Sequence, residues 1–279
     1  MPGPVDICAL CLQRRELRIS HIIPKALYRL YRGDGKEFRN PNPVLLGYKY
    51  RRQTSKQPTD YLLCAECERR FDQNGESWVM FHCYRGRRVF RLRSLILQTQ
   101  SIATGPDLAV YSASAISNIH IEKLAYFAAS VIWRASLRNL DFGGAKYEAI
   151  KLGPYQEQLR SYLLGQGEFP QNALLHVVLS HLEFPLLAGN HPDSIHVDEG
   201  RCHRFHIPGI SFLLTFGKHI PANSRLSCLV HGPLHPIFIG KAGDAFVQTA
   251  LLSLIGQIRM PLPDDNVMEG YECALSKTE

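Results

Sequence analysis

Two Cys-x2-Cys pairs constrain the fold of this chain more than any other feature of its sequence. The pairs are Cys8/Cys11 and Cys64/Cys67, and four cysteines spaced in this way can close a tetrahedral zinc site. One zinc ion bound by both pairs would fix the segment between them as a closed loop. That loop contains His21, so the sequence predicts a small metal-bound unit that carries one histidine.

The length of the chain and its use of cysteine limit the classes of protein to which it can belong. With 279 residues, 45% of them hydrophobic, the chain can bury a large core. The N-terminus has no basic segment followed by an apolar run, and no apolar stretch approaches membrane-spanning length, which predicts a cytoplasmic protein without a membrane partner. Four cysteines are scattered rather than paired, as in proteins of a reducing compartment: Cys83, Cys202, Cys228 and Cys273.

The positive charge is concentrated in the cysteine-bearing third of the chain. Residues 1–95 contain 19 Lys and Arg against 9 Asp and Glu, whereas residues 96–279 contain 13 against 16. This asymmetry favours a polyanionic partner for the first third, and a solvated basic surface is the simpler alternative.

Local patterns between and just after the pairs predict three strands and two helices. A short strand is expected at 16–22, a helix at 26–31, a further short strand near 45–50, and a strand that runs into the second cysteine pair with a helix behind it. The polar segment 40–60 is expected to be extended and to lie along a nucleic-acid backbone. Candidate phosphate ligands in this third are Lys25, Lys49, Arg51, Arg52 and Lys56.

The order of these motifs resembles the HNH endonucleases. A Cys-x2-Cys pair, a Ser-His-Ile-Ile-Pro-Lys segment, and Leu-Leu-Cys-x2-Cys-Glu at the start of a helix are similar to a bacterial subgroup of that family over about the first 75 to 80 residues. The resemblance implies a ββα-metal fold with structural zinc at Cys8, Cys11, Cys64 and Cys67. It also implies hydrolysis of DNA with a divalent cation such as Mg²⁺ or Mn²⁺, and a role in bacterial anti-phage defence, as in Zorya-type systems.

Position by position, the resemblance assigns catalytic roles. His21 matches the general base that activates water, and an imidazole suits this role because its pKa is near neutrality. Asp60 matches the residue that orients the histidine. Glu68 matches a ligand of the catalytic cation, with Glu76 as a second-rank ligand about two helical turns later. Ser20 stands where the family has a stronger ligand, so the resemblance is weakest there.

Residues 83–93 form a second basic segment. Read as a strand, it places Arg87, Arg91 and Arg93 on one face, where they could contact phosphates, and a solvated strand or linker is an equal alternative. The preceding aromatic residues Trp78 and Phe81 are expected to pack against the rest of the chain, with base stacking as the less favoured alternative.

The remainder of the chain indicates a larger α+β domain. Helices are expected at 118–140, capped by Asn118, at 154–164 and at 245–256, and strands at 173–182, 205–216, 225–230 and 236–240. A second metal site at Cys202/His206 or Cys228/His231 is disfavoured because the spacing is weak. The predicted fold is therefore α+β: a zinc-bound ββα-metal module at 1–80, a basic strand or linker at 81–117, and an α+β domain at 118–279 that could bind a protein partner or ligand.

The sequence leaves two alternative functions open, one enzymatic and one of binding alone. The first is a metal-dependent HNH endonuclease or nickase acting on DNA, most simply double-stranded. The second is a catalytically inactive, zinc-bound module that binds nucleic acid as a scaffold or sensor.

Overall fold

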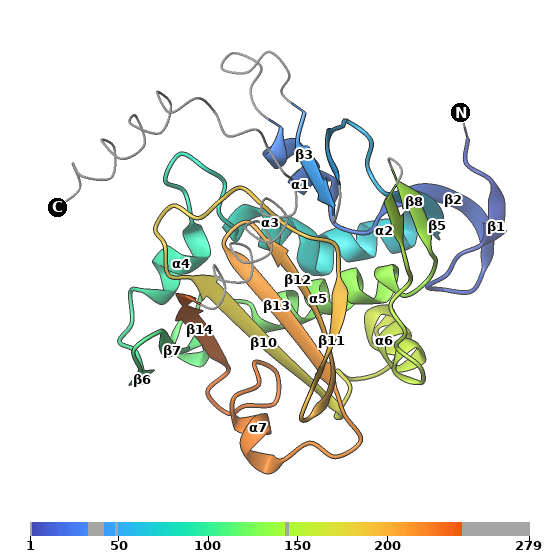
Figure 1. The fold of residues 1–279 in the computed structure, drawn as a ribbon. Coiled ribbons are helices and arrows are strands. Elements are labelled where there is room, and N and C mark those ends of the chain that lie inside the picture. The colour runs from blue at the N-terminus through green and yellow to red at the C-terminus, as the bar shows by residue number, and fades with distance from the viewer. Residues whose placement is uncertain (1, 33–41, 48–49, 143–144, 242–279) are drawn as a thin grey trace, which may run out of the picture.

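The computed structural model describes residues 2–32, 42–47, 50–142 and 145–241 (Figure 1). The predicted helix at 245–256 and Lys49 lie outside these residues. Within them the chain is a mixture of helices and sheets, which confirms the α+β class at that level. No helix in the described segments is apolar over a length that could cross a membrane.

The part of the protein that carries the two Cys-x2-Cys pairs is a three-stranded antiparallel sheet with a helix. The strands β1 (Val5–Ile7), β2 (Arg14–His21) and β5 (Thr59–Cys64) pair in the order β1-β2-β5, and α2 (Ala65–Phe71) starts directly after β5. The predicted strand, strand and helix around the cysteines are therefore present. Between β2 and β5 lie α1 (Lys25–Tyr31), as predicted, and a hairpin of β3 (Val44–Gly47) and β4 (Tyr50–Gln53).

A π-helical turn, η1 (Asp72–Glu76), joins α2 to α3 (Ser77–His82). Gly75 lies at the middle of this turn, and a Cβ there would be 2.9 Å from the backbone nitrogen of Phe127. Only glycine allows η1 to pack this closely on α5 (Ile121–Ala135). Such turns widen a helix locally and are frequent at functional sites.

The larger sheet has seven strands in the order β11-β12-β13-β10-β14-β7-β6, antiparallel except where β10 pairs with β14. Its strands are β6 (Ala103–Thr104), β7 (Leu108–Ser112), β10 (Ala173–Ser180), β11 (Asp193–Val197), β12 (Gly200–Ile207), β13 (Ile210–Phe216) and β14 (Pro236–Gly240). The remaining elements are α4 (Arg91–Ile96), η2 (Ala113–Ala115), β8 (Leu140–Phe142), β9 (Ala145–Tyr147), α6 (Tyr155–Leu164) and α7 (Ala222–Leu226).

Helix α5 connects the two parts of the protein. Phe127 packs on Phe205 and Phe212 of the larger sheet, with ring centroids 5.9 and 5.3 Å away. Trp133, further along the same helix, contacts Phe71 of α2 at 6.1 Å. In Figure 1, α5 lies between the larger sheet and α2. Buried side chains from Cys8 to Ile239 consequently form one cluster, and no gap in this core falls at residue 80. The division at residues 80 and 117 stays a prediction.

The predicted basic strand at 83–93 is wrong. Gly86, Arg87 and Arg88 have φ values of 73, 47 and 62°, so the chain turns back and the amide of Arg85 bonds to the carbonyl of Val89. Helix α4 then begins at Arg91. Three consecutive left-handed residues cannot continue a strand, and alternation therefore does not put Arg87, Arg91 and Arg93 on one face.

Three further boundaries differ from expectation. The predicted strand 205–216 is a hairpin, because Gly209, with φ of 78°, forms its turn. Residues 225–230 are the end of α7 and a turn in which Cys228 and Gly232 make local hydrogen bonds. Helix α5 begins after His120 rather than at an Asn118 cap, and its C-cap is Ser136.

Acid is expected to weaken the sheet through His203. This side chain is 1% exposed on β12, and its Nδ1 is 2.8 Å from the Oγ of Ser194. Burial lowers the pKa of His203 from 6.5 to about 4. Below pH 6.5 the unfolded chain binds a proton that the folded chain does not, so stability is full above 6.5 and falls toward pH 4, by up to about 3 kcal/mol.

Urea unfolding at several pH values measures this effect. His203→Asn, which can still bond to Ser194, should flatten the acid dependence, while His219→Asn, at an exposed position, should leave it unchanged. Equal dependence in wild type and His203→Asn would contradict the assignment.

Candidate functional site

The four cysteines of the two pairs meet in space. Their sulfur atoms all lie within 4.8 Å of one another, and three of the four residues are buried. Cys8 and Cys11 are on the turn between β1 and β2, whereas Cys64 ends β5 and Cys67 is in the first turn of α2. This compact four-sulfur set fits a tetrahedral structural zinc ion, as the sequence predicted.

The surroundings favour the thiolate form of Cys8, whereas the pKa of Cys67 is raised by its hydrogen bond to Cys8 and the pKa of Cys11 is raised by burial. The amide of Cys64 donates to the Sγ of Cys8 over 3.3 Å. A hydrogen bond from Cys67, together with backbone donors, lowers the pKa of Cys8 against the opposing effect of burial. Zinc binds cysteine as thiolate, and amide donors to the sulfur stabilise that form.

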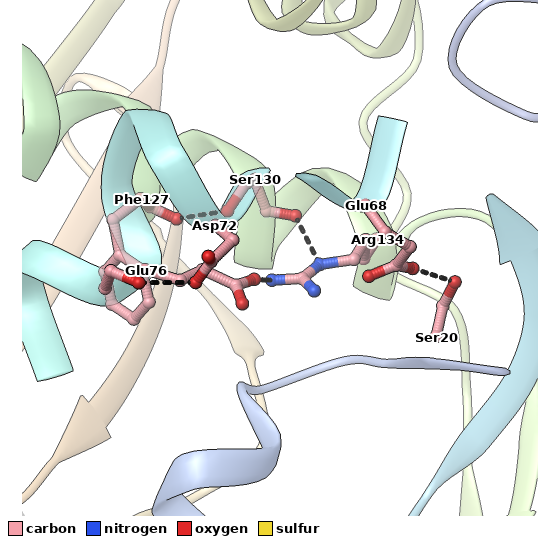
Figure 2. A network of polar contacts seen from close by, with 8 residues as sticks. Ser20, Glu68, Asp72, Glu76, Phe127, Ser130 and Arg134 are labelled. Carbon is pink, nitrogen blue, oxygen red and sulfur yellow. Dashed lines mark hydrogen bonds and ion pairs between the residues drawn. The ribbon is translucent and has the colours of Figure 1, made fainter. Parts of the chain in front are cut away.

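A second polar cluster lies where β2, α2, η1 and α5 meet (Figure 2), and Cys67 of the four-cysteine cluster directly precedes its Glu68 in α2. The Oγ of Ser20 donates to Glu68, and a guanidinium nitrogen of Arg134 donates to Glu76 over 2.5 Å. Arg134 is 1% exposed and Ser20 is fully buried. Arg134 also bonds through Nε to the carbonyl of Ser130, and its guanidinium lies 5.2 Å from the centre of the Phe71 ring.

Burial raises the pKa of Glu68 above its ordinary value, and the nearby carboxylate of Glu76 raises it further. The positive charge of Arg134 and the hydroxyl of Ser20 lower it, but less strongly than burial raises it. Glu68 is thus a carboxyl group that accepts a proton more readily than an exposed glutamate.

The structure therefore brings together the three predicted ligands of the catalytic cation, Ser20, Glu68 and Glu76, but it also supplies a cation of its own. Arg134 occupies the acidic cluster as a buried counter-ion. In the described part of the chain, the four cysteines are the only group of three or more His, Cys, Asp or Glu residues with their ligand atoms gathered. The residues present do not fit a divalent ion as they stand, because the guanidinium of Arg134 already neutralises them.

His21 ends β2 and lies at the edge of this cluster. Its Nε2 is 2.7 Å from the amide oxygen of Gln57, and its ring centroid is 6.0 Å from that of Tyr28. Burial lowers the pKa of His21, and the positive charges of Lys25 and Arg134 lower it further, while the bond to Gln57 opposes them. The imidazole is consequently neutral at physiological pH.

Asp60 does not orient His21. It is opposite Ser20 in the β2/β5 register, and its carboxylate accepts hydrogen bonds from Arg138 at 2.9 Å and from the amide of Tyr61 at 2.7 Å. Gln57 makes the contact to the imidazole that the resemblance assigned to Asp60. The register explains the difference, because side chains of consecutive residues such as Ser20 and His21 point to opposite faces of a strand.

The predicted phosphate ligands are dispersed. Lys25, Lys56 and Arg87 are exposed on α1, on the segment before β5 and on the turn before α4. Arg91 is half-buried and its guanidinium lies 4.1 Å from the centre of the Phe81 ring. Arg93 donates to the carbonyl of His181 over 3.0 Å, so it serves the packing of α4. Arg51 and Arg52 are in β4.

Arg134 and Gln57 are site residues that the sequence interpretation did not identify. Arg134 is seven residues after Phe127, on the same face of a helix that is otherwise apolar, and a charged residue at such a position could have indicated a buried ion pair. Gln57 lies in a polar segment and carried no comparable signal. The disfavoured second metal site is not present among the described residues, where the Sγ of Cys228 accepts from the amide of Leu175 and His206 bonds to Ser211.

Comparison of the chain with protein-family models, with curated proteins and with solved structures gives no match in any of the three. The function is therefore inferred from the residues of this chain.

Proposed function

We propose that this protein is an endonuclease or nickase of the HNH type that hydrolyses DNA phosphodiester bonds, with His21 as the general base. The observation that carries the proposal is His21 itself, a neutral imidazole at the end of β2 that is held at Nε2 by Gln57 and lies near enough to Lys25 and Arg134 for their charges to lower its pKa. The four-cysteine site fixes this strand to α2, which carries Glu68.

The hydrogen bond to Gln57 prepares the imidazole for this role. Because the amide oxygen accepts, Nε2 carries the ring hydrogen and Nδ1 keeps its lone pair. A water molecule bound at Nδ1 could then be deprotonated as it attacks phosphorus. Holding the ring in one tautomer and orientation is the task that the resemblance gave to Asp60.

Charge supports DNA as the substrate. The excess of Lys and Arg falls in residues 1–95, which include every element of the His21 site except α5. Lys25, Arg29 and Arg85 also line a hollow of about 620 Å³ that reaches Glu76. Basic side chains beside the site would hold phosphates without reading sequence. A role in anti-phage defence rests on the resemblance alone.

Cleavage of supercoiled plasmid tests the proposal. His21→Ala is expected to lower the rate of nicking by at least about 100-fold, the usual contribution of a general base. His219→Ala, at an exposed position in the loop after β13, is the matched control and should cleave like wild type. Reactions with Mg²⁺, with Mn²⁺ and with EDTA decide separately whether the predicted divalent cation takes part. Unchanged cleavage by His21→Ala would overturn the role of His21.

One observation favours the second candidate, a zinc-bound DNA-binding module without catalysis. Arg134 already neutralises the carboxylates that would hold a catalytic ion, as expected of a site that keeps its shape without chemistry. Plasmid that is shifted on a gel by wild type and by His21→Ala, and cleaved by neither, would support this candidate.

A further inference from the structure

A hollow of about 570 Å³ lies over α3 and the start of α4, beyond the cluster that contains His21. Its lining combines aromatic rings with two arginines: Trp78, Phe81, His82, Arg88, Arg91 and His120. Hollows of this size suit a nucleotide-sized ligand.

The aromatic side chains are held in fixed orientations. Trp78 and His82 stack with ring centroids 3.9 Å apart and an interplanar angle of 26°, and the Nδ1 of His82 is 2.7 Å from the carbonyl of Trp78. Phe81 is 49% exposed between this pair and Arg91. The aromatic surface of the hollow is thus largely preformed, which reduces the entropy lost when a flat ligand binds.

The charge of the hollow is positive. Arg91 lies on the Phe81 ring, and Arg88 lies 5.2 Å from the centre of the Phe184 ring. Burial lowers the pKa of His82, with further effects from Arg91 and His120, so His82 contributes no charge at neutral pH. The nearby carboxylate of Glu122 is engaged with His120 at 3.0 Å. Arg91 also donates to the carbonyl of Phe81 over 3.4 Å, and no carboxylate lies among the residues that line the hollow. Aromatic rings combined with arginines are the features that bind unpaired nucleotides, by stacking on the base and pairing with the phosphate.

This hollow shares a lining residue with a second, basic hollow near the proposed catalytic site. Phe81 lines both this hollow and the basic hollow that contains Glu76, Lys25, Arg29 and Arg85. Glu76 and Phe81 are five residues apart along η1 and α3, so the two hollows adjoin along one helical segment.

We propose that the hollow over α3 binds an unpaired nucleotide of the nucleic acid, beside the basic hollow that contains Glu76. The base lies against Trp78 and Phe81, and its phosphate is held by Arg88 and Arg91. This inference rests on the proposed function for the identity of the ligand, and it predicts that the protein prefers single-stranded or locally opened DNA at this position to a closed duplex.

Fluorescence anisotropy with the full chain tests the inference, in the His21→Ala background so that the probe is not cut. The probes are a labelled oligothymidylate single strand and a blunt duplex of equal length. Trp78→Ala is expected to weaken binding of the single strand by about ten-fold or more, the effect typical of one lost base stack. Binding of the duplex should change by less than two-fold.

Three further variants keep the test decisive if Trp78→Ala folds poorly. Trp78→Phe should retain most of the affinity. The double variant Arg88→Ala/Arg91→Ala should weaken binding and reduce the slope of log affinity against log salt by about one to two. Tyr61→Ala, at an aromatic residue on β5 that is 37% exposed, is the matched control and should bind like wild type.

The outcomes separate this inference from the proposed function. Single-strand binding that is absent in wild type, or unchanged in a folded Trp78→Ala or in the double arginine variant, overturns the inference even if plasmid is cut. Loss of binding in Trp78→Ala and in the double arginine variant, with no His21-dependent cleavage in wild type, supports the inference and refutes the proposed function.

Discussion

Replacing Cys64 with serine is expected to abolish zinc binding and to lower the thermal midpoint of unfolding by more than about 10 °C. Structural zinc contributes on the order of 10–16 kcal/mol of apparent binding free energy in small zinc domains, and that energy is available only to the folded state. Cys64 ends β5 directly before α2, so loss of its thiolate releases the turn between β1 and β2, which carries Cys8 and Cys11, from the start of α2. Metal analysis and calorimetry on the same preparation measure both effects.

Cys83→Ser is the matched control for this prediction. Cys83 is buried like Cys64, but it lies at the end of α3, outside the four-sulfur cluster. Its thiol points to the carbonyl of Met80 at 3.6 Å, a partner that a serine hydroxyl can also use. Zinc content should stay at wild-type level, with a loss of about 1 kcal/mol at most from the polar substitution. Full zinc occupancy in Cys64→Ser would contradict the structural site.

The loss of stability in Cys64→Ser is expected to spread beyond the first 80 residues. Cys64, Cys67 and Phe71 belong to the same buried cluster as Trp133 and Phe127 of α5, and Phe127 packs on the larger sheet. A cooperative unfolding transition that includes this sheet follows from the shared core. Two separate transitions would instead support the predicted division at residue 80.

Features set by short-range chemistry could be predicted from the sequence. The Cys-x2-Cys spacing is sufficient to indicate a tight turn whose two cysteines can bind one metal ion. The structure brings all four sulfur atoms together, as that spacing implies. Helix α1 and helix α6 have the expected bounds within one residue, since proline before each start and a glycine after Leu164 mark their ends.

Features that depend on a positive φ angle, or on a contact with a residue distant in the sequence, could not be predicted. Arg87 and Arg88 adopt left-handed conformations that their residue types do not favour, so alternation indicated a strand where a turn occurs. The partner of His21 was assigned by family position to Asp60, yet the register places Asp60 opposite Ser20 and gives Gln57 to the imidazole. The counter-ion of Glu76 lies 58 residues away in the chain, on the helix predicted at 118–140, and no local pattern links the two residues.

Arg134→Met is expected to destabilise the protein by about 3 kcal/mol at pH 7, because it leaves buried carboxylates without their cation. Glu76, with its side chain 16% exposed, loses an ion pair of 2.5 Å, and Glu68 loses the positive charge that opposes its burial. Methionine keeps the apolar contact with Phe71, so packing is not the cause. For a chain of this size the expected fall in the thermal midpoint is roughly 6–12 °C.

Arg138→Met is the control. It breaks the ion pair of 2.9 Å between Arg138, just after α5, and Asp60 of β5. Arg138 and Asp60 have side chains that are 53% and 28% exposed, and a pair so accessible to solvent contributes at most about 1 kcal/mol. A much larger effect for Arg134→Met than for Arg138→Met is therefore expected in urea unfolding.

A triple variant identifies the physical cause of the Arg134 effect. When Glu68→Gln and Glu76→Gln accompany Arg134→Met, no buried charge remains unpaired, and most of the lost stability should return. Lower pH should act in the same direction on Arg134→Met alone, because protonation of Glu68, whose pKa is already raised by burial, removes the uncompensated charge. If the triple variant is no more stable than Arg134→Met, then uncompensated charge on Glu68 and Glu76 is not the cause of the lost stability, and the assignment of Arg134 as their counter-ion in folding is wrong.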